Sequence, residues 1–262
     1  MSKTAQLKTV LCDLDGVIWL AHEPIDGSVE AISRLADAGI DVLFVTNNSF
    51  STQSQQRDAL AKIGIPTNGN VLTSAMAAAS CISAGERVMV CGGQGLIEEV
   101  TRVEADVVVP YRQRHQSGPF DAVVVGFHRE FDFDVLSEAL TAVRNGARLV
   151  GSNSDPTYPT PTGPIPGGGS ILAAIEHATG VKALVTGKPH RTMADFVHSV
   201  TPGVDVSEMM MVGDVVSTDG AFARTIGCPF GLVMSGMTAS EHGSGADYVG
   251  KNLADLVDQI LR

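Results

Sequence analysis

Short apolar, β-branched runs alternate with helical patterns along this chain, and that alternation limits its fold more than any other feature. Strand-like runs occur as TVLCDL at 9–14, IDVLFVTNN at 40–48, MMMVGD at 209–214 and CPFGLVM at 228–234. The segment between the first two carries an apolar helical stripe, with Ser28 predicted as its N-cap and Gly39 as its end. Strands separated by helices in this way predict a parallel sheet with crossover helices.

The middle of the chain repeats this pattern as a unit of its own. Further strands are predicted at 87–93, 105–109, 120–127 and 147–153, with helices at 96–100 and 133–145. A Pro/Gly-rich loop, SDPTYPTPTGPIPGGGS, follows them. We therefore expect an α/β core made of residues 1–81 and 181–262, interrupted by an inserted α/β domain at 82–180. The run KALVTG and the helices at 192–200, 219–226 and 253–261 are assigned to the core.

Composition excludes several classes of function. The 262 residues include 29 acidic and 18 basic ones, for a net charge of −11, and an acidic surface repels nucleic acids. No apolar run approaches the roughly 18 residues of a membrane span. The opening MSKTAQLKTV lacks the features of a secretory signal, so a cytoplasmic location is expected.

Two carboxylates stand at the end of the first predicted strand, in TVLCDLDGVIWL. Carboxylates resist burial unless a counter-charge compensates them, so Asp13 and Asp15 need an explanation. Polar groups also follow three other strand-like runs: Thr46, Asn47 and Asn48 in TNN, Lys188 in GKP, and Asp214 and Asp219 in GDVVSTD. Each of these groups alone is weak evidence for a functional site, because an Asp in such a position also forms turns and helix caps.

The combination is more informative than its parts, because the carboxyl ends of parallel strands meet in one crevice. Several carboxylates gathered there would repel one another unless a divalent cation neutralised them. Hard oxygen ligands and incomplete protein coordination favour Mg²⁺ and phosphate-bearing ligands. A hydroxyl, an amide and an ammonium nearby suit the oxygens of a phosphoryl group. The sequence therefore indicates phosphoryl transfer.

In the order DLDGVIW, TNN, GKP and GDVVSTD, these segments resemble the four motifs of the haloacid dehalogenase (HAD) superfamily of phosphohydrolases. The segments DGVIW, TNNS, GSNSDPTYPT and PGGGSILAAIE narrow the resemblance to the NagD-like, p-nitrophenylphosphatase-like branch. Phosphoglycolate, pyridoxal-phosphate and glycerol-phosphate phosphatases belong to that branch. The resemblance implies a doubly wound, Rossmann-like core, with residues 82–180 as an inserted α/β cap that selects the substrate.

The resemblance also implies roles for the two acids of the first motif. Asp13 would be the nucleophile that becomes an aspartyl phosphate. Asp15 would protonate the leaving oxygen and then activate the hydrolytic water. Mg²⁺ would be held by the Asp13 carboxylate, the Asp15 carbonyl, the Asp214 carboxylate and waters, with Asp219 orienting those waters or Lys188.

By the same resemblance, Thr46 and the Asn47 backbone amide would bind the phosphoryl oxygens, and Lys188 would offset negative charge on the nucleophile and the phosphate. Valines within GDVVSTD, and Phe-Ser-Thr after TNNS, depart from many relatives, so no relative's substrate carries over directly. The single tryptophan, Trp19, admits two interpretations: core packing, or a flap over the site. His190 is expected at the surface rather than at the substrate.

In the predicted cap, the loop GSNSDPTYPT is the candidate for contact with the leaving group. Its polar residues are Asn153, Asp155, Tyr158 and Thr160, although Asx and Pro residues also form turns by themselves. The charge of Asp155 would favour neutral polyol or nucleoside leaving groups over highly anionic ones. Relatives also suggest a homodimer formed through the cap.

The sequence thus predicts a Mg²⁺-dependent phosphomonoesterase that acts on small phosphorylated metabolites and on p-nitrophenyl phosphate. Sugar or polyol phosphates and nucleoside monophosphates are the expected substrates, with no nucleic-acid or membrane partner. The alternative is a non-catalytic protein of the same fold that binds and senses a phosphometabolite. A carbon–halogen hydrolase would not need the second acid or the Asp214/Asp219 pair, and a receiver domain would not need the insert.

Overall fold

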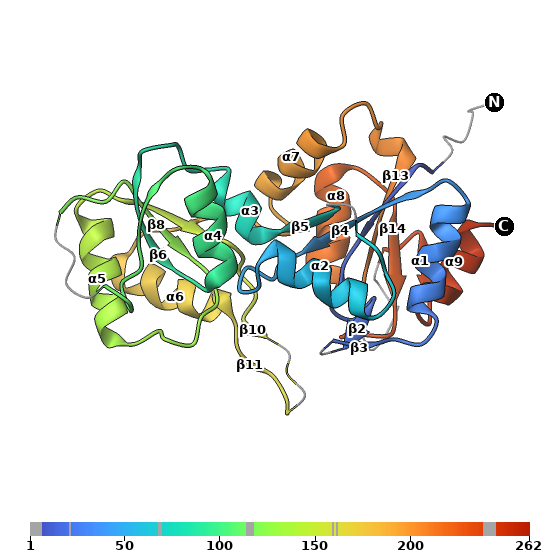
Figure 1. The fold of residues 1–262 in the computed structure, drawn as a ribbon, viewed down its shortest axis with the longest axis horizontal. Coiled ribbons are helices and arrows are strands. Elements are labelled where there is room, and N and C mark those ends of the chain that lie inside the picture. Colours follow the sequence, from blue (N-terminus) through green and yellow to red (C-terminus); the bar gives the residue numbers. More distant parts are fainter. Residues whose placement is uncertain are drawn as a thin grey trace. The chain divides into compact units, whose positions relative to one another are not determined.

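The larger sheet in the computed structural model has six strands in the order β15-β14-β13-β1-β4-β5 (Figure 1). These strands are β1 (Thr9–Cys12), β4 (Asp41–Thr46), β5 (Val71–Thr73), β13 (Met209–Gly213), β14 (Phe230–Val233) and β15 (Tyr248–Gly250). β1 pairs in parallel with both β13 and β4, and Cys12 lies opposite Val212 and Phe44. The carboxyl ends of these three central strands therefore lie at one edge of the sheet.

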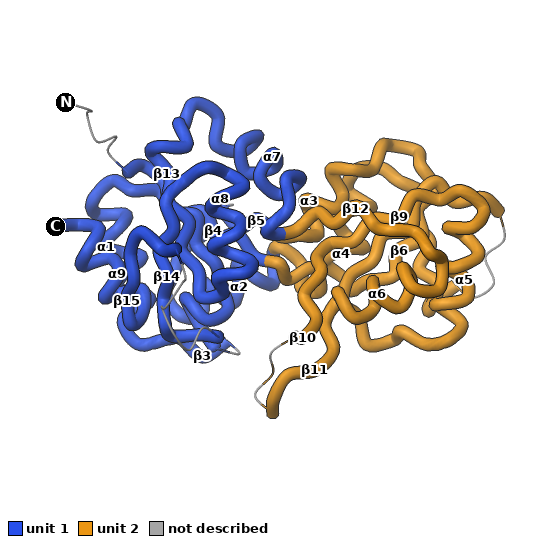
Figure 2. Tube along the Cα trace, turned by 180° about the vertical axis from the view of Figure 1, so that it is seen from behind, with its two compact units in different colours: residues 1–46, 54–72, 188–262 blue, residues 47–53, 73–187 orange. Residues whose placement is uncertain are grey.

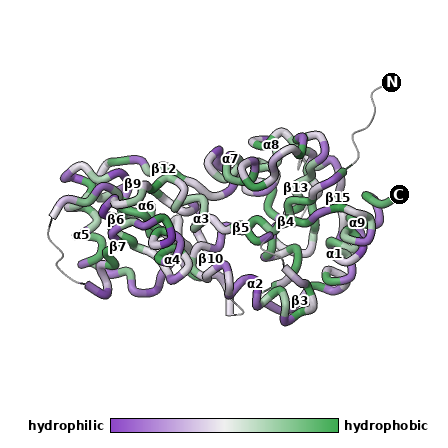
Figure 3. Tube along the Cα trace, turned by 45° about the horizontal axis from the view of Figure 1, so that its top comes forward, coloured by the Kyte–Doolittle hydropathy of each residue, from purple (hydrophilic) through white to green (hydrophobic). Residues whose placement is uncertain are grey.

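Helices cover both faces of this sheet. They are α1 (Ser28–Asp37), α2 (Gln53–Lys62), α7 (Arg191–Val200), α8 (Ala221–Ile226) and α9 (Leu253–Ile260), with a 3-10 turn η1 (Val206–Glu208) and a π-helical turn η2 (Val216–Gly220). α1 and α9 contact each other and share an apolar cluster with Val10 and Cys12 of β1. Leu11 points to the opposite face and is equally buried, as in a parallel sheet covered on both sides. In Figure 3, hydrophobic segments of the chain run along β4 and β13.

The second sheet has five strands in the order β12-β9-β8-β6-β7, all paired in parallel. These strands are β6 (Arg87–Cys91), β7 (Asp106–Val108), β8 (Ala122–Val125), β9 (Arg148–Gly151) and β12 (Leu184–Val185). Val88 and Val90 pack with α3 (Ser74–Ala79) and α4 (Gln94–Arg102). Met89 and Cys91 point the other way, toward α5 (Phe133–Arg144) and α6 (Gly168–Thr179). The alternation along β6 thus builds one apolar layer on each face.

The chain divides into two compact units, shown in Figure 2. The first is Met1–Thr46, Ser54–Leu72 and Lys188–Arg262, and the second is Asn47–Gln53 and Thr73–Gly187. The structure describes residues 7–20, 22–67, 70–113, 118–158, 160, 162–237 and 245–262. The insert expected at 82–180 lies wholly within the second unit, which also includes the segment after β4.

Two short antiparallel hairpins complete the described elements. One joins β2 (Trp19–Leu20) to β3 (Glu23–Pro24) in the first unit, and the other joins β10 (Thr157–Tyr158) to β11 (Ile165–Pro166) in the second. No helix in the described part of the chain is long and apolar enough to cross a bilayer.

Three local predictions need correction. Gly27, with a φ of 76°, is the N-cap of α1, and the Ser28 hydroxyl instead donates to the Ile18 carbonyl at 2.9 Å. The helix expected at 219–226 is divided between η2 and α8. The run KALVTG supplies β12, which pairs with β9 rather than with the six-stranded sheet. The predicted end of α1 is confirmed, because Gly39 adopts a φ of 74° and donates to the Ala36 carbonyl.

Candidate active site

Asp13 and Asp15 occupy the turn that follows β1. The Asp13 N–H continues the sheet by donating to the Val212 carbonyl at 2.9 Å. Leu14 between them is fully buried in the core, whereas both acids are only partly buried. Gly16 then turns the chain with a φ of 85°, a conformation that a side chain would disfavour. The strand end thus presents two carboxylates while it anchors the residue between them.

Lys188 is the positive centre of the site. Its Nζ lies 2.8 Å from Oδ1 of Asp13 and 2.8 Å from Oδ1 of Asp219, and its side chain is only 1% exposed. Burial by itself would lower the pKa of Lys188, but the two carboxylates raise it above its ordinary value. Lys188 therefore stays charged, and it ties the end of β1 to the segment after β13.

Three acids surround this cation. Asp13, Asp214 and Asp219 each offer a carboxylate oxygen, and these oxygens lie within 4.8 Å of one another. Burial raises the pKa of Asp13, Lys188 opposes that shift, and Asp219 and Asp214 add to it. Burial and the Asp219 carboxylate raise the pKa of Asp214 to about 6. The Met237 N–H, which donates to Oδ2 of Asp214 at 2.6 Å, opposes this rise. When ionised, the three acids exceed the single ammonium by two negative charges.

These residues fit a divalent cation of the hard, oxygen-binding kind. Glycines line the Asp214 carboxylate so closely that a Cβ on Gly16 or Gly236 would overlap it. Asp219 uses both of its oxygens, since Lys188 contacts Oδ1 and the Val215 N–H donates to Oδ2 at 3.1 Å. That arrangement suits Asp219 to orient Lys188, and it leaves Asp13 and Asp214 as the better placed carboxylate ligands.

Asp15 has a different environment from Asp13. The Trp19 indole N–H donates to its Oδ1 at 3.1 Å. Burial raises the pKa of Asp15, while Trp19, His22 and Lys188 oppose the shift. The net rise favours a carboxyl group that carries a proton more readily than a free aspartate does, as an acid catalyst requires.

The TNN segment divides between the units. Thr46, the last residue of β4, is buried in the first unit, and Asn47 begins the second. The Asn47 side-chain amide donates to Oδ2 of Asp155 at 3.0 Å. Its carbonyl accepts hydrogen bonds from Ser74 at 2.7 Å and from Asn153 at 2.8 Å. Asn47 is therefore a fixed point for the loop that the sequence predicts to select substrate.

Tyr158 of that loop is held in the same way. The Asn48 amide donates to its hydroxyl at 3.2 Å. Its ring stacks on Phe127 with centroids 5.2 Å apart, and Phe127 in turn contacts Phe50 at 5.4 Å. The Thr160 hydroxyl donates to the Gly163 carbonyl at 2.5 Å. Asn153, Asp155 and Tyr158 thus bond to the TNN segment, and Thr160 closes its own turn.

Several contacts escape the sequence patterns. Met237, Gly236 and Ser235 follow β14, and the Ser235 hydroxyl donates to the Gly16 carbonyl at 2.7 Å. The available signal was the position of SGM after a predicted strand, since its contacts with Asp214 use backbone rather than a diagnostic side chain. Trp19 is buried in the core, as one interpretation expected, yet it also bonds to Asp15. His190 stands at the N-cap of α7 and is partly buried.

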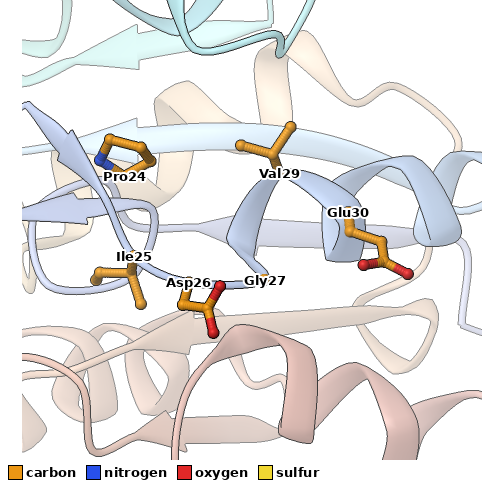
Figure 4. Close-up of a pocket in the computed structure, with 6 residues that line it drawn as sticks. All are labelled: Pro24, Ile25, Asp26, Gly27, Val29 and Glu30. Atoms are coloured by element: carbon orange, nitrogen blue, oxygen red, sulfur yellow. The ribbon is translucent and has the colours of Figure 1, made fainter.

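A separate hollow lies at the start of α1 (Figure 4). Its lining consists of Pro24, Ile25, Asp26, Gly27, Val29 and Glu30. None of these residues belongs to the four polar strand ends. The lining includes two acids, Asp26 and Glu30, and no basic side chain, which disfavours a phosphate in this hollow.

Comparisons with known proteins agree with this chemistry. Residues 10–106 match a family described as haloacid dehalogenase-like hydrolase, and residues 185–256 match a second, HAD-hydrolase-like family. The 5′-nucleotidase YutF of Bacillus subtilis is 35% identical over 239 residues, which are 90% of this chain and 90% of that protein.

Solved structures give the same result. A p-nitrophenyl phosphatase from Archaeoglobus fulgidus superimposes with a TM-score of 0.87 at 30% identity, over 97% of this chain and 99% of the other. The glycerol phosphate phosphatase Rv1692 from Mycobacterium tuberculosis, in complex with magnesium, has a TM-score of 0.82 at 31% identity, over 96% of this chain and 76% of that one.

Proposed function

The chain belongs to the haloacid dehalogenase-like hydrolases and is a phosphoric monoester hydrolase of that family, and on this premise we propose a specific reaction. The protein is a Mg²⁺-dependent phosphomonoesterase that acts through an aspartyl phosphate. Its substrates are small phosphorylated metabolites, either sugar or polyol phosphates or nucleoside monophosphates, and it accepts p-nitrophenyl phosphate in vitro.

The observation that carries the proposal is the buried group formed by Lys188 with Asp13, Asp214 and Asp219. Lys188 neutralises one carboxylate charge and holds Oδ1 of Asp13 at 2.8 Å. The remaining negative charge calls for a cation, and hard oxygen donors in a site that also takes a phosphate favour Mg²⁺. When bound, the metal would supply charge that draws the phosphoryl oxygens toward Asp13.

Each residue has a defined role in the reaction. A carboxylate oxygen of Asp13 forms a bond to phosphorus while the bond to the ester oxygen breaks. Asp15 gives its proton to the departing oxygen and then takes one from the water that hydrolyses the acyl phosphate. Thr46 and the Asn47 backbone hold phosphoryl oxygens, and Lys188 stabilises the charge that builds up on them.

Substrate choice is assigned to the second unit. Asn153, Asp155, Tyr158 and Thr160 are proposed to select the leaving group, with the Tyr158 and Phe127 rings as its rigid support. Among the relatives, one is named a 5′-nucleotidase and another a glycerol phosphate phosphatase, which supports nucleoside and polyol leaving groups. The second unit also carries Phe133, which is 80% exposed, and we assign the homodimer contact to this unit.

A non-catalytic phosphometabolite sensor is the second candidate, because such a protein could keep the fold and the phosphate grip. The distinct surroundings of Asp13 and Asp15 favour catalysis, since a sensor has no use for a separate proton donor.

Phosphate release from p-nitrophenyl phosphate tests the proposal. We expect turnover that requires Mg²⁺, disappears in Asp13→Asn, and persists in Asp37→Asn, a matched change at an exposed position of α1. Turnover without any divalent metal, or full activity in Asp13→Asn, would refute the mechanism. Binding of phosphate esters without turnover would favour the sensor. A panel of glycerol, sugar and nucleoside monophosphates then ranks the leaving groups.

A further inference from the structure

The hydrogen bond between Trp19 and Asp15 joins the proposed proton donor to a fixed side chain. The indole N–H lies 3.1 Å from Oδ1 of Asp15, and Trp19 is only 1% exposed. An indole has one polar atom, and when buried it usually finds a hydrogen-bond partner. Here that partner is the Asp15 carboxylate of the first motif rather than a backbone carbonyl. Core packing alone would not require a bond to this carboxylate.

Backbone contacts make the indole the rigid member of this pair. The Gly16 N–H donates to the Trp19 carbonyl at 2.8 Å, and the N–H of Ile18 donates to the Leu14 carbonyl at 2.9 Å. Trp19 then enters β2, which pairs with β3. Its ring also packs against His22, with centroids 5.1 Å apart. The ring is therefore held from several sides. The Asp15 carboxyl is only partly buried and can rotate about its two side-chain torsions, so the indole can fix its orientation.

We infer that Trp19 is a positioning residue for Asp15: by binding Oδ1, it turns Oδ2 toward the leaving oxygen of the substrate. The inference rests on the proposed function. It assigns to Trp19 a part in one particular step, rather than a general contribution to the core.

That step is the departure of the leaving group. As Asp13 forms its bond to phosphorus, the electron pair of the breaking P–O bond moves onto the ester oxygen. The proton on Oδ2 of Asp15 moves to that oxygen, so the alcohol leaves neutral and Asp15 becomes a carboxylate. A nitrophenolate is stable without this proton, whereas a phenolate without the nitro group benefits from it much more.

Two aryl esters of similar shape therefore test the inference. In the Mg²⁺-loaded enzyme, Trp19→Phe keeps an aromatic ring but removes the donor. We expect kcat/KM to fall about tenfold or more for phenyl phosphate, yet by less than about twofold for p-nitrophenyl phosphate, since acid catalysis commonly contributes 10²–10⁴-fold. The ratio kcat/KM is the proper measure because it covers the steps up to departure of the leaving group.

Ile18→Val is the matched control, because Ile18 is a buried neighbour in the same cluster that offers no side-chain donor. It should leave the ratio of the two substrates unchanged. Equal losses for both substrates in Trp19→Phe would mean a purely structural role and would overturn the inference while the proposed function stands. A wild-type protein that hydrolyses neither ester would overturn both.

Fluorescence gives a second test that does not need a folded Trp19 variant. Trp19 is the only tryptophan in the chain, so the emission belongs to this residue alone. Asp15→Ala removes the acceptor and should shift the emission maximum, whereas Asp37→Ala, at an exposed position of α1, should not. Emission that is unchanged in Asp15→Ala would contradict the contact on which the inference depends.

Discussion

Lys188 shows how one side chain balances a site whose other charges are all negative. Its ammonium bridges Asp13 and Asp219, which lie far apart along the chain. The sequence could predict that these groups gather, because Asp13 and Asp214 follow adjacent parallel strands. It could not predict that the Met237 N–H bonds to Asp214, because a backbone donor has no residue-type signature. Nor could it predict that the Trp19 indole bonds to Asp15, because a tryptophan is first expected to pack in the core.

Replacing Lys188 by Met should therefore harm stability and activity together. The change leaves buried carboxylates without their counter-charge, and breaking a buried ion pair in this way costs about 3–5 kcal/mol. Urea unfolding of the metal-free protein measures the loss. The control is Lys182→Met, whose side chain is 88% exposed and paired with Glu176, and which should cost at most about 1 kcal/mol. Similar losses in the two variants would contradict the view of Lys188 as the central cation.

At the scale of elements, the sequence predicts strands well where both faces are buried and poorly at the edges. β1 and β13 are buried throughout, and their largely apolar runs predict core strands. β12 has only two residues, and Leu184 is 52% exposed. Such a short edge strand carries no pattern that says which sheet it joins, so its pairing with β9 was not predictable. The helix expected at 219–226 is likewise divided between η2 and α8, which the sequence pattern did not indicate.

The loop before β10 carries a prediction about selectivity. Asp155 bears a negative charge beside the Asn47 amide, so it should repel leaving groups that carry charges of their own. Asp155→Asn is expected to raise kcat/KM for an anionic ester such as phosphoglycolate relative to glycerol phosphate, by about tenfold at most. Asp134→Asn, at an exposed position of α5, serves as the control. An unchanged preference in Asp155→Asn would remove this residue from the selecting loop.

The strand end after β8 carries a prediction about pH. His128 is 2% exposed, its ring stacks on Tyr111, and its Nδ1 lies 3.3 Å from the Gly126 carbonyl. Burial lowers the pKa of His128, while the Gly126 carbonyl, Glu130 and Asp132 oppose the shift. Below the ordinary pKa of about 6.5, the unfolded chain takes up a proton that the folded chain resists, so the contribution of His128 to stability should fall as pH falls. The raised pKa values of Asp13, Asp15 and Asp214 act in the opposite direction.

Unfolding by urea between pH 7 and pH 5 measures this effect. Relative to the wild type, His128→Phe should lose less stability between pH 7 and pH 5, because it removes a group whose protonation opposes folding. The control His177→Phe changes an exposed histidine on α6 and should keep the wild-type slope. A dependence of stability on pH in His128→Phe identical to that of the wild type would show that His128 does not contribute to it.

On the scale of the whole molecule, the site depends on segments drawn from all along the first unit. Asp13 follows β1, Asp214 follows β13, and Met237 lies beyond β14, so the sheet must be complete before the acids can meet. The sequence foresaw this assembly because parallel strands present their carboxyl ends together. It did not foresee that residues 47–53 would belong to the second unit.

Metal binding should consequently stabilise the fold against unfolding. A ligand that binds only the folded state at a hundred times its dissociation constant contributes about 2.7 kcal/mol. Calorimetry with and without Mg²⁺ should show a higher melting temperature in the wild type and little change in Asp214→Asn. The same rise in both proteins would place the metal elsewhere.

The segment Asn47–Gln53 also limits how the second unit can be exchanged between related enzymes. It interrupts the first unit in sequence, yet Asn47 accepts hydrogen bonds from Ser74 and Asn153, and Ser49 bonds to Ser152 within the second. Transplanting 73–187 alone into a relative would leave these donors facing a foreign loop. A chimaera that borrows selectivity must therefore carry both stretches, and recombination at a single pair of breakpoints cannot supply them.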